Sequence, residues 1–132
     1  MMKELEKYKE YFITRSDGEI IDFLLKHGNK QTVNFILNKQ IVDPKELCAV
    51  LSWLEDKYAK RHGNFTLEIF MDPEEGFHFI EVCCPKGSWE EWKKLSKEVK
   101  EEMRDAGMQD IASKVAIVCL EALQEQGGEV IR

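Results

Sequence analysis

Two carboxylates and a histidine in one predicted β-hairpin are the side chains most suited to acid–base or metal chemistry. Glu68 and Glu81 fall on opposite strands and share one face, where neighbouring carboxylates raise one another's pKa. His78 points to the other face of the same hairpin. Because the three groups do not converge, solvated or interface carboxylates are the interpretation we favour. A small enzyme or metal-binding protein using the Glu68/Glu81 pair stays an alternative.

The pair Cys83–Cys84, followed by Pro85, is the second chemical candidate. Adjacent strand residues face opposite ways, so the two sulfurs diverge and cannot bind one ion without distortion. A nucleophilic cysteine also needs a base or a helix N-terminus, and the helix predicted to begin at Ser88 is close in sequence. Thiol chemistry at Cys83 therefore stays open beside core packing, which we favour.

The tryptophans and the other histidines have structural explanations. Trp53, Trp89 and Trp92 are typical of a stacking platform for a sugar or a base, but Trp89 and Trp92 share an apolar helical stripe, which favours core packing. His27 and His62 fall at predicted helix C-termini, where a protonated imidazole suits the helix dipole. With no Gly-rich phosphate loop and no Cys-x-x-Cys pair, we expect no metal and no cofactor.

The hairpin that positions the acidic candidates runs from Asn64 to Pro85. Two runs rich in aromatic and β-branched residues flank the turn Asp-Pro-Glu-Glu-Gly. A four-residue loop, Pro73 to Gly76, predicts the pairs Leu67–Val82, Ile69–Ile80 and Phe65–Cys84, which make one face apolar. On the other face Glu68 then lies opposite Glu81, and Phe70 lies opposite Phe79.

Helices are predicted on both sides of the hairpin. Lys3 to Phe12 is expected to form a short amphipathic helix, and Ser16 with Glu19 forms a capping box for a second helix that ends at Gly28. The stripe of that second helix contains Ile20, Ile21, Leu24 and Leu25. Thr32 to Leu37 is read as a helix, with a strand as the alternative. Asp43 and Pro44 begin a long helix that ends at Gly63.

Two more helices are expected after the hairpin. Ser88 and Glu91 form a second capping box for a helix that ends at Gly107. Met108 to Gln126 is then read as a central helix, because apolar residues surround most of its circumference. Lys114 to Leu120 would also suit a buried strand, but the run that contains it is long and rich in Ala and Glu.

Composition limits the class of protein. The chain has 132 residues, a net charge of −6 and 43% hydrophobic residues, which indicates a folded chain of one-domain size, residues 1–132. The negative charge argues against sequence-blind binding to nucleic acid or to an anionic membrane. No segment reaches the ~18 consecutive apolar residues of a membrane span, and the first twelve residues lack a signal-peptide core. We therefore expect a cytoplasmic protein, and its many Lys and Glu residues lean toward a heat-adapted source.

The order of elements from residue 19 to residue 84 resembles a winged helix-turn-helix domain. The resemblance is carried by Ile20-Ile21-Asp22-Phe23-Leu24-Leu25-Lys26-His27-Gly28 and by Leu51-Ser52-Trp53-Leu54-Glu55, and it implies a DNA-binding transcriptional regulator. It also implies that the helix from Lys45 to Arg61 reads DNA and that the hairpin is the wing. The sequence departs from the pattern because that helix begins Pro44-Lys45-Glu46 and because the wing tip is acidic.

We predict an α+β fold, with an antiparallel hairpin, extended by a third strand or by a dimer partner, packed against four to five helices. A lone hairpin is marginal, so its second face needs a cover, and we expect a homodimer. The predicted function is that of a non-catalytic homodimeric interaction or regulatory module, with a protein partner. The binding residues we expect are Glu68, Phe70, Phe77, Phe79 and Glu81.

Overall fold

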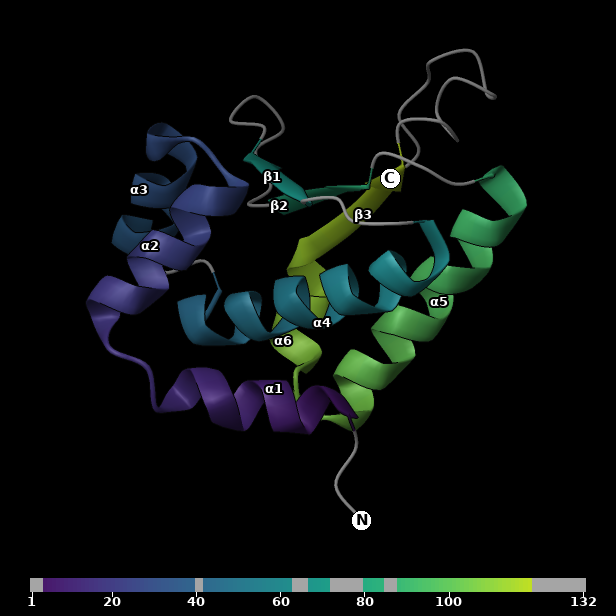
Figure 1. Ribbon diagram of the computed structural model, residues 1–132, viewed down its shortest axis with the longest axis horizontal. Coiled ribbons are helices and arrows are strands. Elements are labelled where there is room, and N and C mark those ends of the chain that lie inside the picture. Colours follow the sequence, from purple (N-terminus) through teal and green to yellow (C-terminus); the bar gives the residue numbers. More distant parts are fainter. Residues whose placement is uncertain (1–3, 40–41, 63–66, 72–79, 85–87, 120–132) are drawn as a thin grey trace.

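A computed structural model of the chain describes residues 4–39, 42–62, 67–71, 80–84 and 88–119. This part of the chain is mostly helical and carries a small three-stranded sheet, with strand order β1-β2-β3 (Figure 1). It contains six helices, where the sequence predicted four to five. The elements are α1 Glu4–Ile13, α2 Asp17–His27, α3 Lys30–Lys39, α4 Pro44–His62, β1 Glu68–Met71, β2 Ile80–Cys84, α5 Trp89–Asp105, α6 Gln109–Lys114 and β3 Val115–Cys119.

The helix boundaries follow the capping residues that the sequence shows. The Ser16 hydroxyl accepts a hydrogen bond from the Glu19 backbone N–H, and Ser88 does the same for Glu91 at the start of α5. The Asp43 carboxylate accepts from the backbone N–H of Lys45 at 2.9 Å, which begins α4. The segment that contains Thr32 to Leu37 is helical, as preferred over a strand.

The hairpin is antiparallel as predicted, but its register is shifted by two residues. Ile69 pairs with Val82, and Phe70 pairs with Glu81. The expected Glu68–Glu81 and Ile69–Ile80 pairs are therefore wrong, and the predicted partner of Phe70, Phe79, lies outside the described residues. Because side chains alternate every residue, a shift of two leaves each side chain on its predicted face. Leu67, Ile69 and Ile80 are buried, as that face requires.

The prediction of one helix over Met108–Gln126 is wrong for the part that the structure describes, which ends at residue 119. In that part Gln109–Lys114 is helical, and the chain then enters β3, which pairs in parallel with β2. The third strand of the sheet thus comes from this segment, at Val115–Cys119. The segment Val115–Cys119 is a continuous apolar run rather than an alternating pattern, and such a run is easily mistaken for a buried helix.

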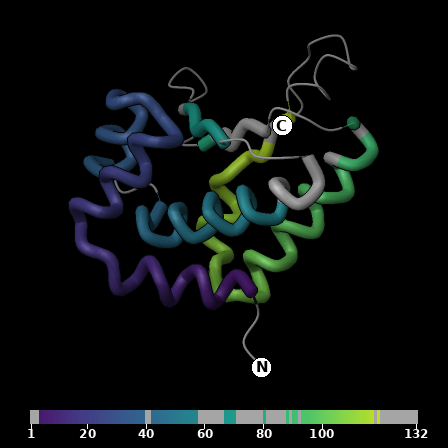
Figure 2. Tube along the Cα trace, viewed as in Figure 1, coloured from purple at the N-terminus to yellow at the C-terminus, as the bar shows by residue number. Residues whose placement is uncertain are grey.

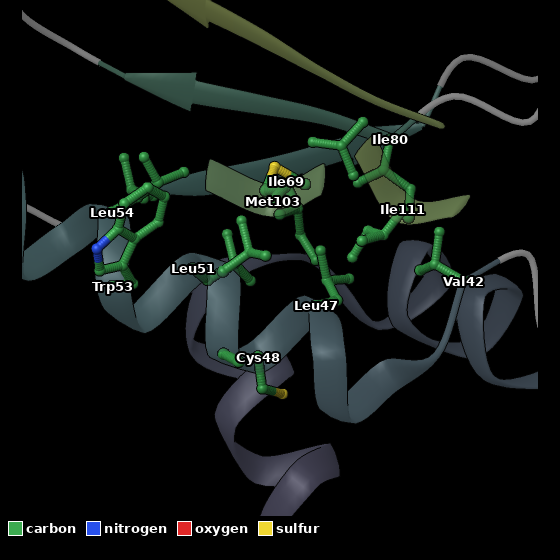
Figure 3. Close-up of a cluster of buried hydrophobic side chains, with 14 of the residues drawn as sticks. Val42, Leu47, Cys48, Leu51, Trp53, Leu54, Ile69, Ile80, Met103 and Ile111 are labelled. Atoms are coloured by element: carbon green, nitrogen blue, oxygen red, sulfur yellow. The ribbon is translucent and has the colours of Figure 1, made fainter. Parts of the chain in front are cut away.

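Helix α4 is the centre of the core. It lies between α1 and the sheet, and α5 passes beside its C-terminal end (Figures 1 and 2). Side chains from α4, the sheet, α5 and α6 meet in one cluster, whose labelled members in Figure 3 include Leu47, Leu51, Ile69, Met103 and Ile111. No helix of the described ranges is both long and apolar enough to cross a bilayer.

Candidate functional site

The structure places part of the predicted binding face on the outer side of β1. Glu68 and Phe70 are both exposed there. Glu81 lies opposite Phe70 in the sheet rather than opposite Glu68. The other two predicted binding residues, Phe77 and Phe79, and also His78, lie outside the described residues. The described part of this face therefore shows one exposed aromatic ring beside one carboxylate.

A hollow of about 290 Å³ lies beside Phe70, between β1 and the end of α2. Leu25 and Phe70 border it, and their side chains are 42% and 44% exposed. Lys26 and Glu68 supply one charge of each sign at its edge. Large apolar side chains around a hollow are typical of a contact surface, because anchor residues of a partner fill such hollows.

The outer side of α2 continues this apolar surface. The sequence predicted one stripe of four residues, but the structure divides it, because Ile20 and Leu24 are buried while Ile21 and Leu25 remain exposed. A second hollow, of about 640 Å³, lies at the other end of the helix, where Ile21 faces α3 and the start of α4. We call Gly18, Ile21 and Leu25 the α2 ridge.

His27 joins α2 to β1. Its side chain is 4% exposed, and its Nδ1 lies 2.8 Å from the backbone oxygen of Leu67. A carbonyl oxygen only accepts, so Nδ1 carries a proton and donates. The approach is close at Gly28, where an added Cβ would lie 2.6 Å from Cγ1 of Ile69. Glycine at position 28 therefore lets the end of α2 reach the strand.

Glu55 of α4 completes this connection. The Leu67 backbone N–H donates to its carboxylate, and a carboxylate oxygen lies 3.6 Å from Nε2 of His27. Burial raises the pKa of Glu55 above its ordinary value, while the charge of His27 and the hydrogen bond from Leu67 act in the opposite direction. Both backbone groups of Leu67 are thus bound by side chains from two helices. These side chains hold the chain in place at Leu67, the residue directly before β1.

A depression of about 850 Å³ lies in the corner between α1, α2 and α4. Aromatic rings of Tyr8, Tyr11, Phe12 and Phe23 line it, and the Arg15 guanidinium lies 4.3 Å from the centre of the Tyr11 ring. Three basic and three acidic side chains surround these rings: Lys7, Arg15, Lys26, Glu4, Glu19 and Asp22. The equal numbers of opposite charges give this corner no preference for a cation or an anion.

Tyr8 connects this corner to α4. Its hydroxyl donates a hydrogen bond to the Asp56 carboxylate. Burial, this bond and the charges of Asp56 and Glu4 raise the pKa of Tyr8. The phenol therefore stays protonated and ties α1 to α4, which suits a structural role rather than a general base.

The cysteines and the tryptophan that the structure describes lie in the core. Cys48 and Cys119 are both buried, and burial raises the pKa of Cys48 to about 12. Trp53 is fully buried as well, so it offers no platform for a ligand. Among the described residues, no three His, Cys, Asp or Glu side chains are placed to hold a metal ion. The side chains of Cys83, Cys84, Trp89 and Trp92 are not among those described.

The helix that the winged-helix resemblance assigns to DNA is the central helix of the core. Its residues 47–51, 53 and 54 are all buried. Between residues 44 and 57, Asp56 is the one exposed side chain, and it is acidic. A recognition helix must lay one face in the major groove. The burial of α4 therefore argues against a DNA-reading role.

Comparisons of this chain with protein-family models, with curated proteins and with solved structures found no match.

Sequence reasoning identified Phe70 and Glu68 on an outward face, but it did not identify the α2 ridge. Ile21 and Leu25 are apolar residues at helical spacing, so they were assigned to the core together with Ile20 and Leu24. The available signal was the width of that stripe. Four apolar residues at 20, 21, 24 and 25 cover more of the helix than one neighbouring layer buries.

Proposed function

We propose that this protein is a non-catalytic homodimeric interaction or regulatory module, and that it binds through the α2 ridge and Phe70. The observation that carries this proposal is the exposure of Ile21, Leu25 and Phe70 around hollows at the two ends of α2. Large apolar side chains gathered around hollows mark contact surfaces more often than they mark catalytic sites.

The energy available at this surface is moderate. Burying a whole Leu, Ile or Phe side chain is worth about 1.5–3 kcal/mol. The exposed fraction of the side chain is 36% for Ile21, 42% for Leu25 and 44% for Phe70. Burying what remains exposed would therefore contribute about 1 kcal/mol for each of them on binding. Part of this gain offsets the entropy lost on association, and we therefore expect a reversible dimer rather than a permanent one.

The test is the mass of the full-length protein in solution, measured by sedimentation velocity over a range of concentrations. Leu25→Glu and Phe70→Glu each place a carboxylate in the proposed contact, twice in a symmetric dimer, so both variants should be monomers. Tyr11→Glu is the matched control, because Tyr11 is also a large exposed side chain, 53% exposed, but lies on α1. A monomeric wild type would refute the proposal, and so would dimers that neither Leu25→Glu nor Phe70→Glu affects.

A further inference from the structure

Helix α2 has a buried row of side chains and an outer apolar row, and the described residues cover the outer row only in part. Ile20, Leu24 and His27 form the stripe that packs on the body of the protein. Gly18, Ile21 and Leu25 follow the spacing i, i+3, i+7, which places them in one row on the outer side. An added Cβ at Gly18 would meet nothing within 4 Å, so that end of the row is open.

Charges beside this row have a pattern along the helix. Asp22 and Lys26 are exposed, four residues apart, and form a second row along one flank of the ridge. The first turn of α2 carries Asp17 and Glu19, and the last turn carries Lys26. The helix is therefore acidic where it begins and basic where it ends, and the helix macrodipole prefers the same distribution.

Resting on the homodimer proposed above, we infer that its partner is a second α2, packed antiparallel across a two-fold axis between Ile21 and Leu25. In this arrangement Ile21 of one protomer packs on Leu25 of the other, twice. The same flanks of the two helices meet, so Asp22 of one protomer lies beside Lys26 of the other, also twice. A two-fold contact requires such a self-complementary surface.

The antiparallel direction follows from the charges. A parallel pair would set the acidic first turns side by side and align the two macrodipoles, which is unfavourable. The antiparallel pair sets each acidic start beside a basic end. It also brings the open position at Gly18 to the end where Leu25 and Phe70 of the other protomer lie, and glycine leaves room there for a ring.

The test exchanges charges across the proposed contact. Asp22→Lys alone places two lysines at each contact, and Lys26→Glu alone places two carboxylates there. Each variant by itself should therefore dimerise about 10- to 100-fold more weakly than wild type. Mixing the two variants restores opposite charges at both contacts, so the mixture should form a heterodimer of nearly wild-type affinity. Sedimentation velocity with one fluorescently labelled variant measures this directly.

The matched control is the pair Lys97→Glu and Glu101→Lys on α5, which is also exposed and four residues apart. These changes should leave the dimer unchanged. A wild-type dimer with unaffected single variants, or a mixture that stays monomeric, would overturn the α2 contact while leaving the homodimer in place. A wild type that is monomeric at every concentration would overturn both the homodimer and the α2 contact. The α2 ridge would then be expected to bind a different protein.

Discussion

Replacing His27 is the sharpest test of how the helical part of the molecule holds the sheet. In His27→Ala the backbone oxygen of Leu67 loses its donor, and Leu67 is fully buried. An unpaired buried carbonyl costs about 1–3 kcal/mol. The variant also loses the packing of the His27 ring on Phe23, whose centroid lies 4.7 Å away, and such a ring contact is worth about 0.5–1.5 kcal/mol. We expect a total loss of about 3 kcal/mol in the free energy of unfolding.

His27→Gln separates the two contributions. The glutamine amide can donate to the same carbonyl oxygen, so this variant loses mainly the ring contact, and its cost should be about 1 kcal/mol. The free energies of unfolding are measured by urea denaturation at pH 7, followed by circular dichroism. Hydrogen exchange of the Leu67 amide gives a local measurement, and exchange should be faster in His27→Ala than in His27→Gln.

Gln31→Ala is the control at a nearby exposed position on α3 and should change the free energy of unfolding by less than about 0.5 kcal/mol. Equal losses in His27→Ala and His27→Gln would show that the hydrogen bond to Leu67 does not hold β1. Losses below about 0.5 kcal/mol in both would refute the role of His27 altogether.

Two further predictions concern ionisable groups whose pKa is raised by burial. The pKa of Glu55 is raised above its ordinary value of 4.5, so the folded state binds the carboxyl proton of Glu55 more tightly than the unfolded state does. This contribution to stability is present below pH 4.5, and it is lost as the pH rises through the pKa of Glu55 in the folded state. The stability of Glu55→Gln relative to wild type should therefore increase as the pH rises from 4.5, measured by denaturation at a series of pH values; a constant difference would contradict this. Cys48, with its thiol pKa near 12, should resist iodoacetamide at pH 8 in the folded protein and react in denaturant, as read from its peptide by mass spectrometry; equal labelling in both states would contradict its burial.

Most helix boundaries could be predicted because they depend on local chemistry. Ser16, Asp43 and Ser88 each accept hydrogen bonds from the first backbone N–H groups of a helix, and such caps lie within three residues in the sequence. The helical end at Gly107 is local as well, because its φ of +77° suits glycine. These signals need no knowledge of the rest of the chain.

The register of the hairpin and the strand β3 depend on partners far away in the sequence. A shift of two residues keeps every side chain on the same face, so the pattern of Leu67, Ile69 and Ile80 allowed two registers equally well. Val115 to Cys119 becomes a strand because β2 offers it a parallel edge. Nothing within the segment itself distinguishes that outcome from a buried helix.

Only part of the candidate surface could be predicted, because some of its features are local and others depend on contacts between distant residues. The alternation of the hairpin placed Phe70 and Glu68 on the outward face correctly. The width of the apolar stripe on α2 indicates that part of it is exposed, but the identity of the exposed residues, Ile21 and Leu25, depends on which side of α2 meets α3 and α4. The contact of His27 with Leu67 joins residues forty positions apart, and only the folded chain shows it.

The parallel pairing of β3 with β2 has a consequence for how the chain is made. During synthesis the hairpin strands emerge from the ribosome early, while the strand that completes the sheet emerges only after the whole of α5 and α6. Until then β2 presents an unsatisfied edge, which is the kind of surface that pairs with other chains. A chain that ended before Val115 would leave this edge unpaired, and we expect such a truncated fragment to aggregate more readily than the whole chain.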